Sequence, residues 1–358
     1  MKICIYGGGN VGTQLAVHSA EKNHETWIYT SKPNLFSNTL EIVNENDEII
    51  HRGEIKAATN NAEEAFKNAD VIFVTIPAFA LKEAKEAIKP FVKPGMIIIF
   101  VPGSGAGEYV MKEFLEEGVI LSGIQRVPSV ARLVEYGKCV RASGYRDIMH
   151  VASVPSSESN KIKGLVSSLL DMETEVLPNY LNLTMTPSNP ILHTSRLYSL
   201  FRDYKEGVEY ERIPLFYEEW SLDSAELLLS CDEEVQNIVK AIPLDLKGVK
   251  SLRVHYESDT AEALKNKIQS IQSFKGITTP SVKLDNGKFI PDLNSRYFTA
   301  DFPFGLKILL DLASITNVEA PTMKKIYDWY KDLVNPKEYF EIQKYNINTL
   351  DDLLAFYK

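Results

Sequence analysis

A glycine pattern near the start of the chain sets strong limits on its fold. Gly7, Gly9 and Gly12 form G-x-G-x-x-G directly after an apolar run at residues 2–6. In such a pattern the first glycine permits a tight turn, the second lets a pyrophosphate approach the backbone, and the third lets a helix pack on the strand. The strand and helix around it favour this interpretation over an ordinary glycine-rich turn. The residues predicted to hold a dinucleotide are Gly7, Gly9, Asn10, Val11 and Gly12.

The first half of the chain alternates apolar runs with helical patterns. The runs predicted as strands span residues 2–6, 26–29, 71–76, 96–101 and 119–123. The segments predicted as helices span residues 11–22, 62–68, 80–89 and 108–116. Continuous apolar runs separated by helices are typical of parallel strands covered on both faces. We therefore predict an α/β Rossmann domain with a doubly wound parallel sheet over residues 1–178, with residues 139–143 and 149–153 extending the sheet at one edge.

Helical periodicity dominates from about Asn179 onward. Predicted helices span residues 190–201, 215–229, 232–242, 260–270, 305–316 and 321–334. Residues 276–299 contain Pro280, Gly287 and Pro291 and are predicted as a loop. The sequence therefore predicts a second, mostly α-helical domain over residues 179–358, which would carry the substrate and catalytic residues.

The residues after the second predicted strand bear on the choice of dinucleotide. NAD-binding sites tend to end this strand with a carboxylate that bonds the ribose 2′-hydroxyl. Here Thr30, Ser31 and Lys32 follow, and hydroxyls with an ammonium group favour the 2′-phosphate of NADP. The alternative for Lys32 is a solvated loop lysine. Pro77 and Ala78 follow another predicted strand, at the edge of the sheet where ligands bind, and are predicted to border the cofactor.

Composition and charge restrict the partners and the compartment. The 358 residues carry a formal net charge of -9, which argues against a nucleic-acid partner. No apolar stretch approaches membrane-spanning length, and the opening apolar run is too short for a signal peptide. Cys4, Cys139 and Cys231 lack the spacing of a disulfide framework or a zinc site. We therefore expect a cytoplasmic protein with no membrane or nucleic-acid partner and no metal in its site.

Two segments of the second half carry candidate catalytic residues. His193 follows Asn189 and Pro190, which are predicted to cap and begin a helix, so the imidazole would lie in a first helical turn. Arg296 and Asp301 precede another apolar helical pattern. A guanidinium is the natural bidentate ligand for a substrate carboxylate. A structural histidine and a surface Arg–Asp pair are the alternatives.

These segments, together with the glycine pattern, resemble the opine dehydrogenase family of the octopine and nopaline type. The matching stretches are residues 7–12, 189–193 (N-P-I-L-H) and 296–305 (R-Y-F-T-A-D-F-P-F-G), and they appear in family order. Residues 125–132 (Q-R-V-P-S-V-A-R) are similar to a family loop that typically begins with an acid and carries a cysteine. Here Gln125 replaces the acid and Ala131 the cysteine.

The resemblance implies NAD(P)H-dependent reductive condensation of an amino acid with a 2-oxo acid such as pyruvate, and the reverse reaction. It implies that His193 shuttles protons, that Asp301 orients the imidazole, and that Arg296 holds the oxo acid's carboxylate. Gln125 and Asn189 are expected to contact substrate, with Gln125 influencing the amino donor. NADP is the preferred cofactor in this prediction, and NAD is the alternative.

Two other functions remain compatible with the sequence. A 2-oxo acid reductase resembling ketopantoate reductase would share the dinucleotide-binding half and need no amine. A non-catalytic dinucleotide sensor would bind the cofactor without turnover, and would have no use for His193, Arg296 and Asp301. The amino acid, the oxo acid and the direction of the reaction are left open. The sequence allows a homodimer without indicating one.

Overall fold

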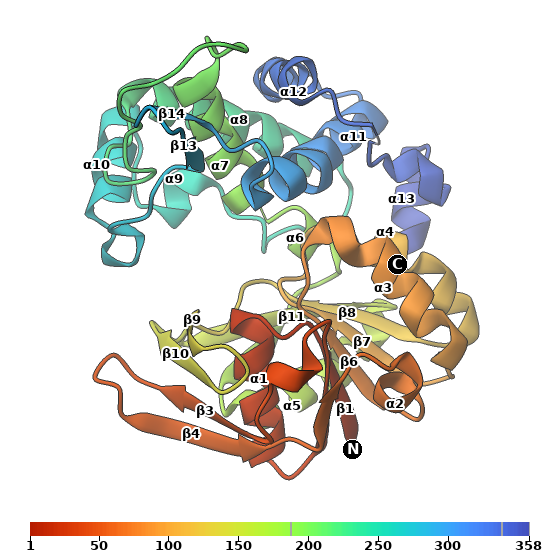
Figure 1. Ribbon diagram of the computed structural model, residues 1–358. Coiled ribbons are helices and arrows are strands. Elements are labelled where there is room, and N and C mark those ends of the chain that lie inside the picture. Colours follow the sequence, from red (N-terminus) through yellow and green to blue (C-terminus); the bar gives the residue numbers. More distant parts are fainter. Residues whose placement is uncertain (187, 338, 358) are drawn as a thin grey trace. The chain divides into compact units, whose positions relative to one another are not determined.

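The computed structural model describes residues 1–186, 188–337 and 339–357. The chain divides into two compact units, Met1–Thr184 with the last residues from Ala355, and Met185–Leu354. The division falls at Thr184, whereas the sequence places it after residue 178. The first unit has the predicted α/β Rossmann fold and the second is mostly helical, so the predicted fold class is confirmed (Figure 1).

The core of the first unit is a largely parallel sheet with strand order β12-β11-β8-β7-β6-β1-β2-β5. Its strands are β1 (Lys2–Tyr6), β2 (Glu25–Tyr29), β5 (Ala57–Thr59), β6 (Val71–Val74), β7 (Ile97–Phe100), β8 (Ile120–Ile124), β11 (Ile148–Val154) and β12 (Glu173–Val176). Every residue of β6 and β7 is buried, as continuous apolar runs predict for central strands. The chain reverses its direction of strand addition between β1 and β6, and open α/β sheets bind ligands beside the carboxyl ends of such strands.

Helices cover both faces of this sheet (Figure 1). One group consists of α1 (Asn10–Glu21) and α5 (Ser159–Leu170), and the other of α2 (Ala62–Phe66), α3 (Leu81–Ile88) and α4 (Gly107–Val110). The helix predicted at residues 108–116 is α4 followed by a 3-10 segment, η4 (Lys112–Glu117). The remaining short elements of the unit are η1 (Pro33–Leu35), η2 (Ala78–Ala80), η3 (Lys89–Phe91), η5 (Ser156–Glu158) and α6 (Leu181–Thr184).

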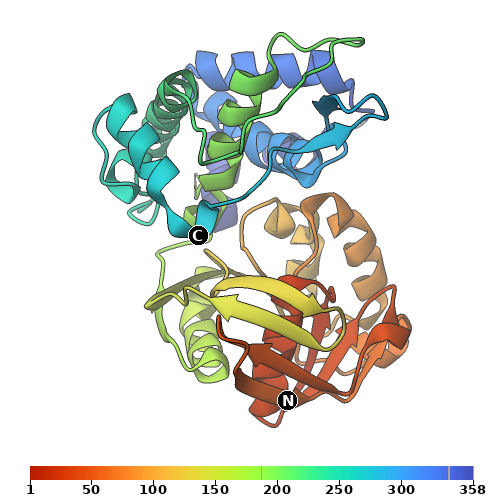
Figure 2. The ribbon, with the colours of Figure 1, turned by 60° about the vertical axis from the view of Figure 1, so that its left-hand side comes forward.

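A smaller sheet with strand order β4-β3-β10-β9 packs against α1 (Figure 2). Its strands are β3 (Thr39–Val43), β4 (Ile49–Glu54), β9 (Val130–Glu135) and β10 (Cys139–Ser143). The prediction that residues 139–143 extend the main sheet is therefore wrong, because β10 pairs with β3 and β9. Only alternate residues of β10 are buried, as expected where one face of a sheet meets a core. Residues 149–153 do extend the main sheet, as β11.

The second unit is built around α7 (Ser188–Phe201) and α8 (Leu222–Ala241). Its other elements are α9 (Leu252–His255), α10 (Ala261–Ser270), η6 (Gln272–Phe274), β13 (Ser281–Lys283), β14 (Phe289–Pro291), the π-helix η7 (Tyr297–Leu306), α11 (Lys307–Thr316), α12 (Pro321–Val334), η8 (Ile342–Tyr345) and most of α13 (Leu350–Tyr357). The segment predicted as a loop contains the β13–β14 hairpin. Within the described residues, none of the helices has the length and hydropathy needed to cross a membrane.

The two helices predicted at residues 215–229 and 232–242 form the single helix α8. Its start is fixed by Ser221, whose side chain accepts a hydrogen bond from the backbone N–H of Ser224. Neither proline nor glycine interrupts the sequence from Leu222 to Ala241, so the helix continues through the position where the prediction divides it.

A buried acid lies inside the first unit. Glu108 in α4 is fully buried, and its carboxyl group accepts hydrogen bonds from the hydroxyls of Thr184 and Tyr357. Burial raises the pKa of Glu108 to about 7. A carboxyl group whose pKa is higher in the folded chain than in the unfolded chain stabilises the fold fully at low pH. That contribution is lost as the pH rises through the folded pKa.

We expect Glu108→Gln to remove this pH dependence. From about pH 4 to about pH 8, the wild type should lose about 3 kcal/mol of unfolding free energy relative to the variant, measured by urea unfolding. Glu116→Gln, at an exposed position in η4, is the control and should keep the wild-type profile. Parallel pH profiles for wild type and Glu108→Gln would contradict the prediction.

Candidate active site

The glycine pattern forms the turn between β1 and α1. Gly7 has a φ of +114°, and a Cβ there would lie 2.8 Å from the Thr75 hydroxyl. A Cβ at Gly12 would lie 1.9 Å from the carbonyl oxygen of Gly7, so only glycine lets α1 approach the turn this closely. A Cβ at Gly9 would meet no atom within 4 Å, which leaves the space above this residue open.

The N-terminus of α1 begins at this turn. Gly9 is its N-cap, and no side chain caps the helix. The first N–H groups of a helix lack partners inside it, and with the helix dipole they favour an anion. The side chains of the next two residues contact other parts of the unit. Asn10 Oδ1 accepts a hydrogen bond from the backbone N–H of Leu133 (2.7 Å), and Val11 packs against the hydrophobic core. The open space and the uncapped N–H groups fit a dinucleotide pyrophosphate.

Thr30, Ser31 and Lys32 follow β2 directly. Thr30 is buried, and its hydroxyl bonds the backbone N–H of Lys32 and the hydroxyl of Tyr136, each at 3.3 Å. Ser31 and Lys32 are exposed, with the Lys32 ammonium 5.8 Å from the centroid of the Tyr136 ring. Ser31 and Lys32 therefore present their side chains to solvent, whereas Thr30 holds the loop.

The loops after β6, β7 and β8 lie at the carboxyl edge of the main sheet. The Thr75 hydroxyl donates to the backbone of β1 at 3.0 Å and so ties the end of β6 to the glycine turn. Pro77 and Ala78 begin the next turn, and a Cβ at Gly105 would touch Ala78 at 3.5 Å. Gln125 is half-buried and directly follows β8. The predicted cofactor residues of the first unit and Gln125 thus belong to one edge of its sheet.

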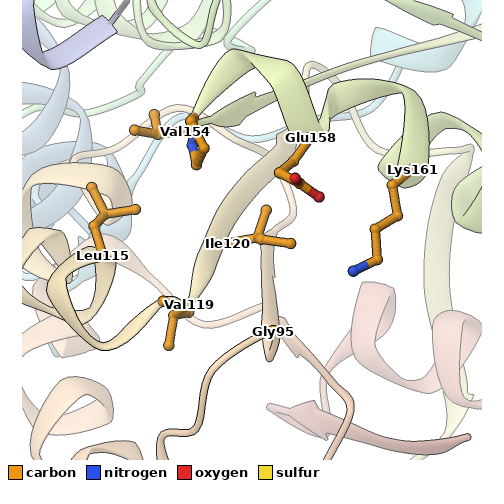
Figure 3. Close-up of a pocket in the computed structure, with 9 residues that line it drawn as sticks. Gly95, Leu115, Val119, Ile120, Val154, Glu158 and Lys161 are labelled. Carbon is orange, nitrogen blue, oxygen red and sulfur yellow. The ribbon is translucent and has the colours of Figure 1, made fainter.

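A hollow of about 540 Å³ lies at the opposite edge of the same sheet (Figure 3). It is lined by Gly95, Leu115, Gly118, Val119, Ile120, Val154, Pro155, Glu158 and Lys161. Gly95 and Val119 precede β7 and β8, so the hollow lies at the amino ends of these parallel strands. Ligands of open α/β sheets bind at the carboxyl ends. This hollow is therefore not part of the candidate site.

His193, Asp301 and Tyr217 form a hydrogen-bonded group in the second unit. His193 Nδ1 lies 2.7 Å from Asp301 Oδ2, and His193 Nε2 lies 2.8 Å from the Tyr217 hydroxyl. His193 is only 3% exposed and Tyr217 only 5%. The structure thus brings together two predicted residues that are 108 positions apart in the sequence.

Two helices position this pair. His193 lies on α7, and Asp301 lies on η7, a π-helix that contains Pro303. A Cβ at Gly305 would lie 3.0 Å from the ring of Pro190, so glycine at this position lets η7 pack closely on α7. π-helical turns are rare in proteins as a whole, and those that occur often lie at functional sites.

The predicted cap of α7 is wrong. The helix begins at Ser188, so Asn189 is its exposed second residue and His193 stands in its second turn. Pro190 is then the third residue, where the missing N–H removes no bond within the helix. A proline in the first turn therefore marks the start of this helix without fixing its first residue. Pro187, which precedes Ser188 in the sequence, lies outside the described residues.

Aromatic rings surround the imidazole. The ring centroids of Tyr297 and Phe216 lie 4.3 Å and 5.6 Å from that of His193. Tyr217 stacks on Phe274 with centroids 4.1 Å apart. Burial raises the pKa of Tyr217 well above its usual range, so the phenol stays neutral. The imidazole therefore packs among aromatic rings, which restrict its orientation.

The two partners of His193 define what its nitrogens can do. Where Asp301 Oδ2 accepts a hydrogen bond from Nδ1–H, Nε2 is left as the acceptor of a hydrogen bond that the Tyr217 hydroxyl donates. A carboxylate that orients a histidine in this way leaves the second nitrogen available for proton exchange. The group can therefore take up and return a proton at Nε2.

Arg296 is the exposed residue immediately before η7. Its guanidinium carbon lies 5.6 Å from the centroid of the Tyr297 ring, and that ring contacts His193. Within the described residues no ion pair joins Arg296 to Asp301, so the surface Arg–Asp pair considered above is not what the structure contains. A cation held against an aromatic face, one ring from the imidazole, is well suited to bind an anionic substrate group.

The sequence does not single out Tyr217. It belongs to a segment predicted as helix, but residues 215–221 form the turn before α8. Arg196, one helical turn beyond His193 and 1% exposed, holds this turn by donating to the carbonyls of Phe216 (3.0 Å) and Glu219 (2.7 Å). No spacing rule connects a tyrosine in a loop with a histidine 24 residues earlier.

Comparisons with known proteins agree with this organisation. The family described as NAD/NADP octopine/nopaline dehydrogenase, alpha-helical domain, matches residues 176–334, and the N-terminus of NAD-dependent glycerol-3-phosphate dehydrogenase matches residues 2–125. A tauropine dehydrogenase of Arabella iricolor is 29% identical, over 98% of this chain and 99% of its own. An opine dehydrogenase of Haliotis discus hannai is 27% identical, over 98% of both chains.

Solved structures show the same fold. A structure of octopine dehydrogenase with NADH and L-arginine has a TM-score of 0.86 at 22% identity, covering 99% of this chain and 98% of that one. The similarity therefore extends over both units, through the glycine turn as well as through the helices that carry His193 and Asp301. Residues 176–334 thus match the octopine/nopaline dehydrogenase family, and over nearly its whole length the chain is similar to tauropine, opine and octopine dehydrogenases.

Proposed function

We propose that this enzyme catalyses the NAD(P)H-dependent reductive condensation of an amino acid with pyruvate or a similar 2-oxo acid, and the reverse reaction. The buried His193–Asp301 pair, with Tyr217 on its second ring nitrogen, carries the proposal, because this reaction needs a group that exchanges protons. The relatives are tauropine, opine and octopine dehydrogenases, and solved octopine dehydrogenase structures contain NADH with L-arginine or with pyruvate.

In this proposal the first unit holds the dinucleotide. The pyrophosphate is held by the backbone at Gly7, Gly9, Asn10, Val11 and Gly12, and Pro77 and Ala78 border the cofactor. When bound, the reduced nicotinamide supplies the hydride that converts the imine carbon to a secondary amine carbon. Two observations support the assignment: the open space above Gly9 and the N-terminus of α1 that no side chain caps.

His193 is proposed to handle the protons of the condensation. The neutral amine of the amino acid attacks the carbonyl carbon, forming a C–N bond while the carbonyl electrons move to oxygen. Nε2 takes a proton from the attacking nitrogen and passes it to the alkoxide oxygen, which gives a carbinolamine. His193 then gives a second proton, taken up from solvent, to the hydroxyl, which leaves as water as the nitrogen lone pair forms the C=N bond and the C–O bond breaks. Asp301 stabilises the imidazolium in between. Tyr217, hydrogen-bonded to Nε2 at 2.8 Å, is proposed to hold the imidazole until substrate arrives.

The remaining predicted residues are proposed to hold substrate. Arg296 binds the oxo acid's carboxylate through its planar guanidinium. Gln125, at the carboxyl end of β8, is proposed to influence the choice of amino donor. Asn189 is exposed in the first turn of α7, one helical turn before His193, and is proposed to contact substrate there.

The proposed function is tested by following NADH and NADPH oxidation with pyruvate or 2-oxoglutarate, with and without each amino acid. We expect oxidation that depends on both an oxo acid and an amino acid, and a secondary amine dicarboxylate as product. Equal rates with and without any amino acid would replace the proposal with a simple 2-oxo acid reductase. No turnover with any pair, in a protein that binds the dinucleotide, would indicate a sensor.

We expect NADPH to have a higher kcat/KM than NADH, because Ser31 and Lys32 stand exposed where a ribose-binding carboxylate would otherwise stand. Lys32→Ala should lower kcat/KM for NADPH by about 10- to 100-fold, the value of a hydrogen bond to a charged group, and leave NADH unchanged. Lys163→Ala, an exposed lysine of α5, is the control. A higher kcat/KM for NADH in the wild type would remove the idea.

A further inference from the structure

A cluster of potential metal ligands lies in the first unit, away from the glycine turn. His18 and Glu21 lie three residues apart on α1, and His51 lies on β4 of the smaller sheet. One ring nitrogen of each histidine and one carboxylate oxygen of Glu21 all lie within 4.8 Å of one another. Along α1, His18 is nine residues beyond Gly9, about 14 Å, so the cluster takes no part in the proposed reaction.

Close packing of β4 on α1 creates the cluster. A Cβ at Gly53 would lie 2.6 Å from the carbonyl oxygen of Val17 and 3.0 Å from the backbone nitrogen of Glu21, so glycine is needed for this approach. His51 is two residues before Gly53 and therefore on the same face of the strand, toward α1. Its imidazole lies 4.6 Å from that of His18, measured between ring centroids, and its Nδ1 lies 2.8 Å from Glu21 Oε2.

His18 has a buried ring nitrogen without a partner. The residue is only 2% exposed, and its Nε2 has no hydrogen-bond partner among the described residues. A neutral imidazole binds a metal through the lone pair of such a nitrogen. A buried nitrogen without a partner is costly in a folded protein unless something binds it.

The charges around the cluster also suit a cation. Glu21 supplies a carboxylate, and Asp171, which pairs with Lys22, is near enough to interact electrostatically with both histidines. Tyr145 contacts His18 through its ring and stays neutral, because burial raises its pKa. Glu21 also lines a surface hollow of about 590 Å³.

We propose that His18, Glu21 and His51 bind a divalent transition-metal ion of the zinc class, which joins β4 to α1. Two imidazoles and one carboxylate form a ligand set that zinc prefers, whereas magnesium and calcium prefer oxygen ligands alone. Ligands of a tetrahedral zinc ion lie about 3.4 Å apart, so rotation of the half-exposed His51 and Glu21 side chains completes the geometry. The His51–Glu21 hydrogen bond is replaced by bonds to the ion, and water fills the fourth position. The sequence alone predicts no metal site, because His18 and His51 are far apart along the chain.

The test uses the full chain, freed of metal with a chelator, and zinc chloride as the probe. Isothermal titration should show one zinc ion bound per chain. An excess of zinc about 100-fold above the dissociation constant should raise the unfolding temperature by about 4 °C. Magnesium chloride at the same concentration should do neither. NAD(P)H oxidation should be the same with and without zinc, which separates this test from that of the proposed function.

Three variants locate the site. His51 is half-exposed, so His51→Ala should fold normally. His51→Ala and Glu21→Gln should each weaken zinc binding by at least about 100-fold, because removing even a group that only supports a ligand lowers metal affinity 10- to 100-fold. His24→Ala removes a half-buried histidine of the same unit outside the cluster and should bind zinc as the wild type does. Wild-type affinity in His51→Ala, or no zinc binding by the wild type, would overturn the proposal.

Discussion

Replacing His193 with alanine should lower kcat by about 10²- to 10⁴-fold, the usual contribution of a group that exchanges protons in the transition state. His193 is buried, and its two nitrogens are held by Asp301 and Tyr217. The loss should therefore appear in kcat, measured as amino-acid-dependent NAD(P)H oxidation, with the affinity for the dinucleotide unchanged. His255→Ala, a histidine on α9, is the control and should keep kcat within about twofold of wild type.

Asp301→Ala should also lower kcat, and the double variant with His193→Ala should be little slower than His193→Ala alone. Residues that act as one unit are not additive, because a carboxylate that orients an imidazole has nothing to orient once the imidazole is gone. Tyr217→Phe removes the hydroxyl while keeping the ring stacked on Phe274. It should alter the pH profile of kcat more than its maximum. Independent, multiplicative losses in the double variant would show that His193 and Asp301 do not act together.

Replacing Arg296 with alanine should raise KM for the 2-oxo acid by about 10- to 100-fold, because a charge-assisted bond to a carboxylate is worth about 1.5–3 kcal/mol. KM for the amino donor should change much less, and the dissociation constant of the dinucleotide should stay the same. Arg296→Lys should recover only part of the loss, because an ammonium keeps the charge but not the planar pair of donors.

The control for this variant is Arg202→Ala. Arg202 follows the far end of α7 and pairs with Asp223, so it tests whether loss of any exposed arginine of this unit has the same effect. A KM that rises equally for both substrates in Arg296→Ala would show that this residue supports the unit's structure and does not bind the oxo acid.

The central sheet of the first unit could be predicted from the sequence because its signals are local. Strands β1, β6, β7 and β8 are short apolar runs that are buried on both faces, and β2 is a short run in which alternate residues are buried. The glycine turn could be predicted for the same reason. The requirement for a missing Cβ at Gly12 arises from a backbone only five residues away, at Gly7.

The smaller sheet could not be predicted in this way. In β4 most residues are exposed or half-buried, and the strand is recognisable only by its pairing with β3 and its packing on α1. The prediction for residues 139–143 gives β10 the wrong neighbours, because an apolar run shows that a strand exists but not which strand lies beside it. Strand pairing is a contact between distant segments. The free energy that favours one pairing over another comes from side chains on neighbouring strands, which the strand's own sequence does not specify.

Local patterns in the sequence are sufficient to predict a dinucleotide-binding α/β half and a helical half, and they indicate His193, Arg296 and Asp301 as candidates. The pairing of His193 with Asp301, the hydrogen bond of Tyr217 to the second nitrogen, and the contact of His18 with His51 arise from tertiary packing. The two sets of features differ in the range of the interactions behind them. Backbone preferences and hydrophobic periodicity act over a few residues, whereas a hydrogen bond between side chains 108 positions apart exists only after the helices that carry them have packed.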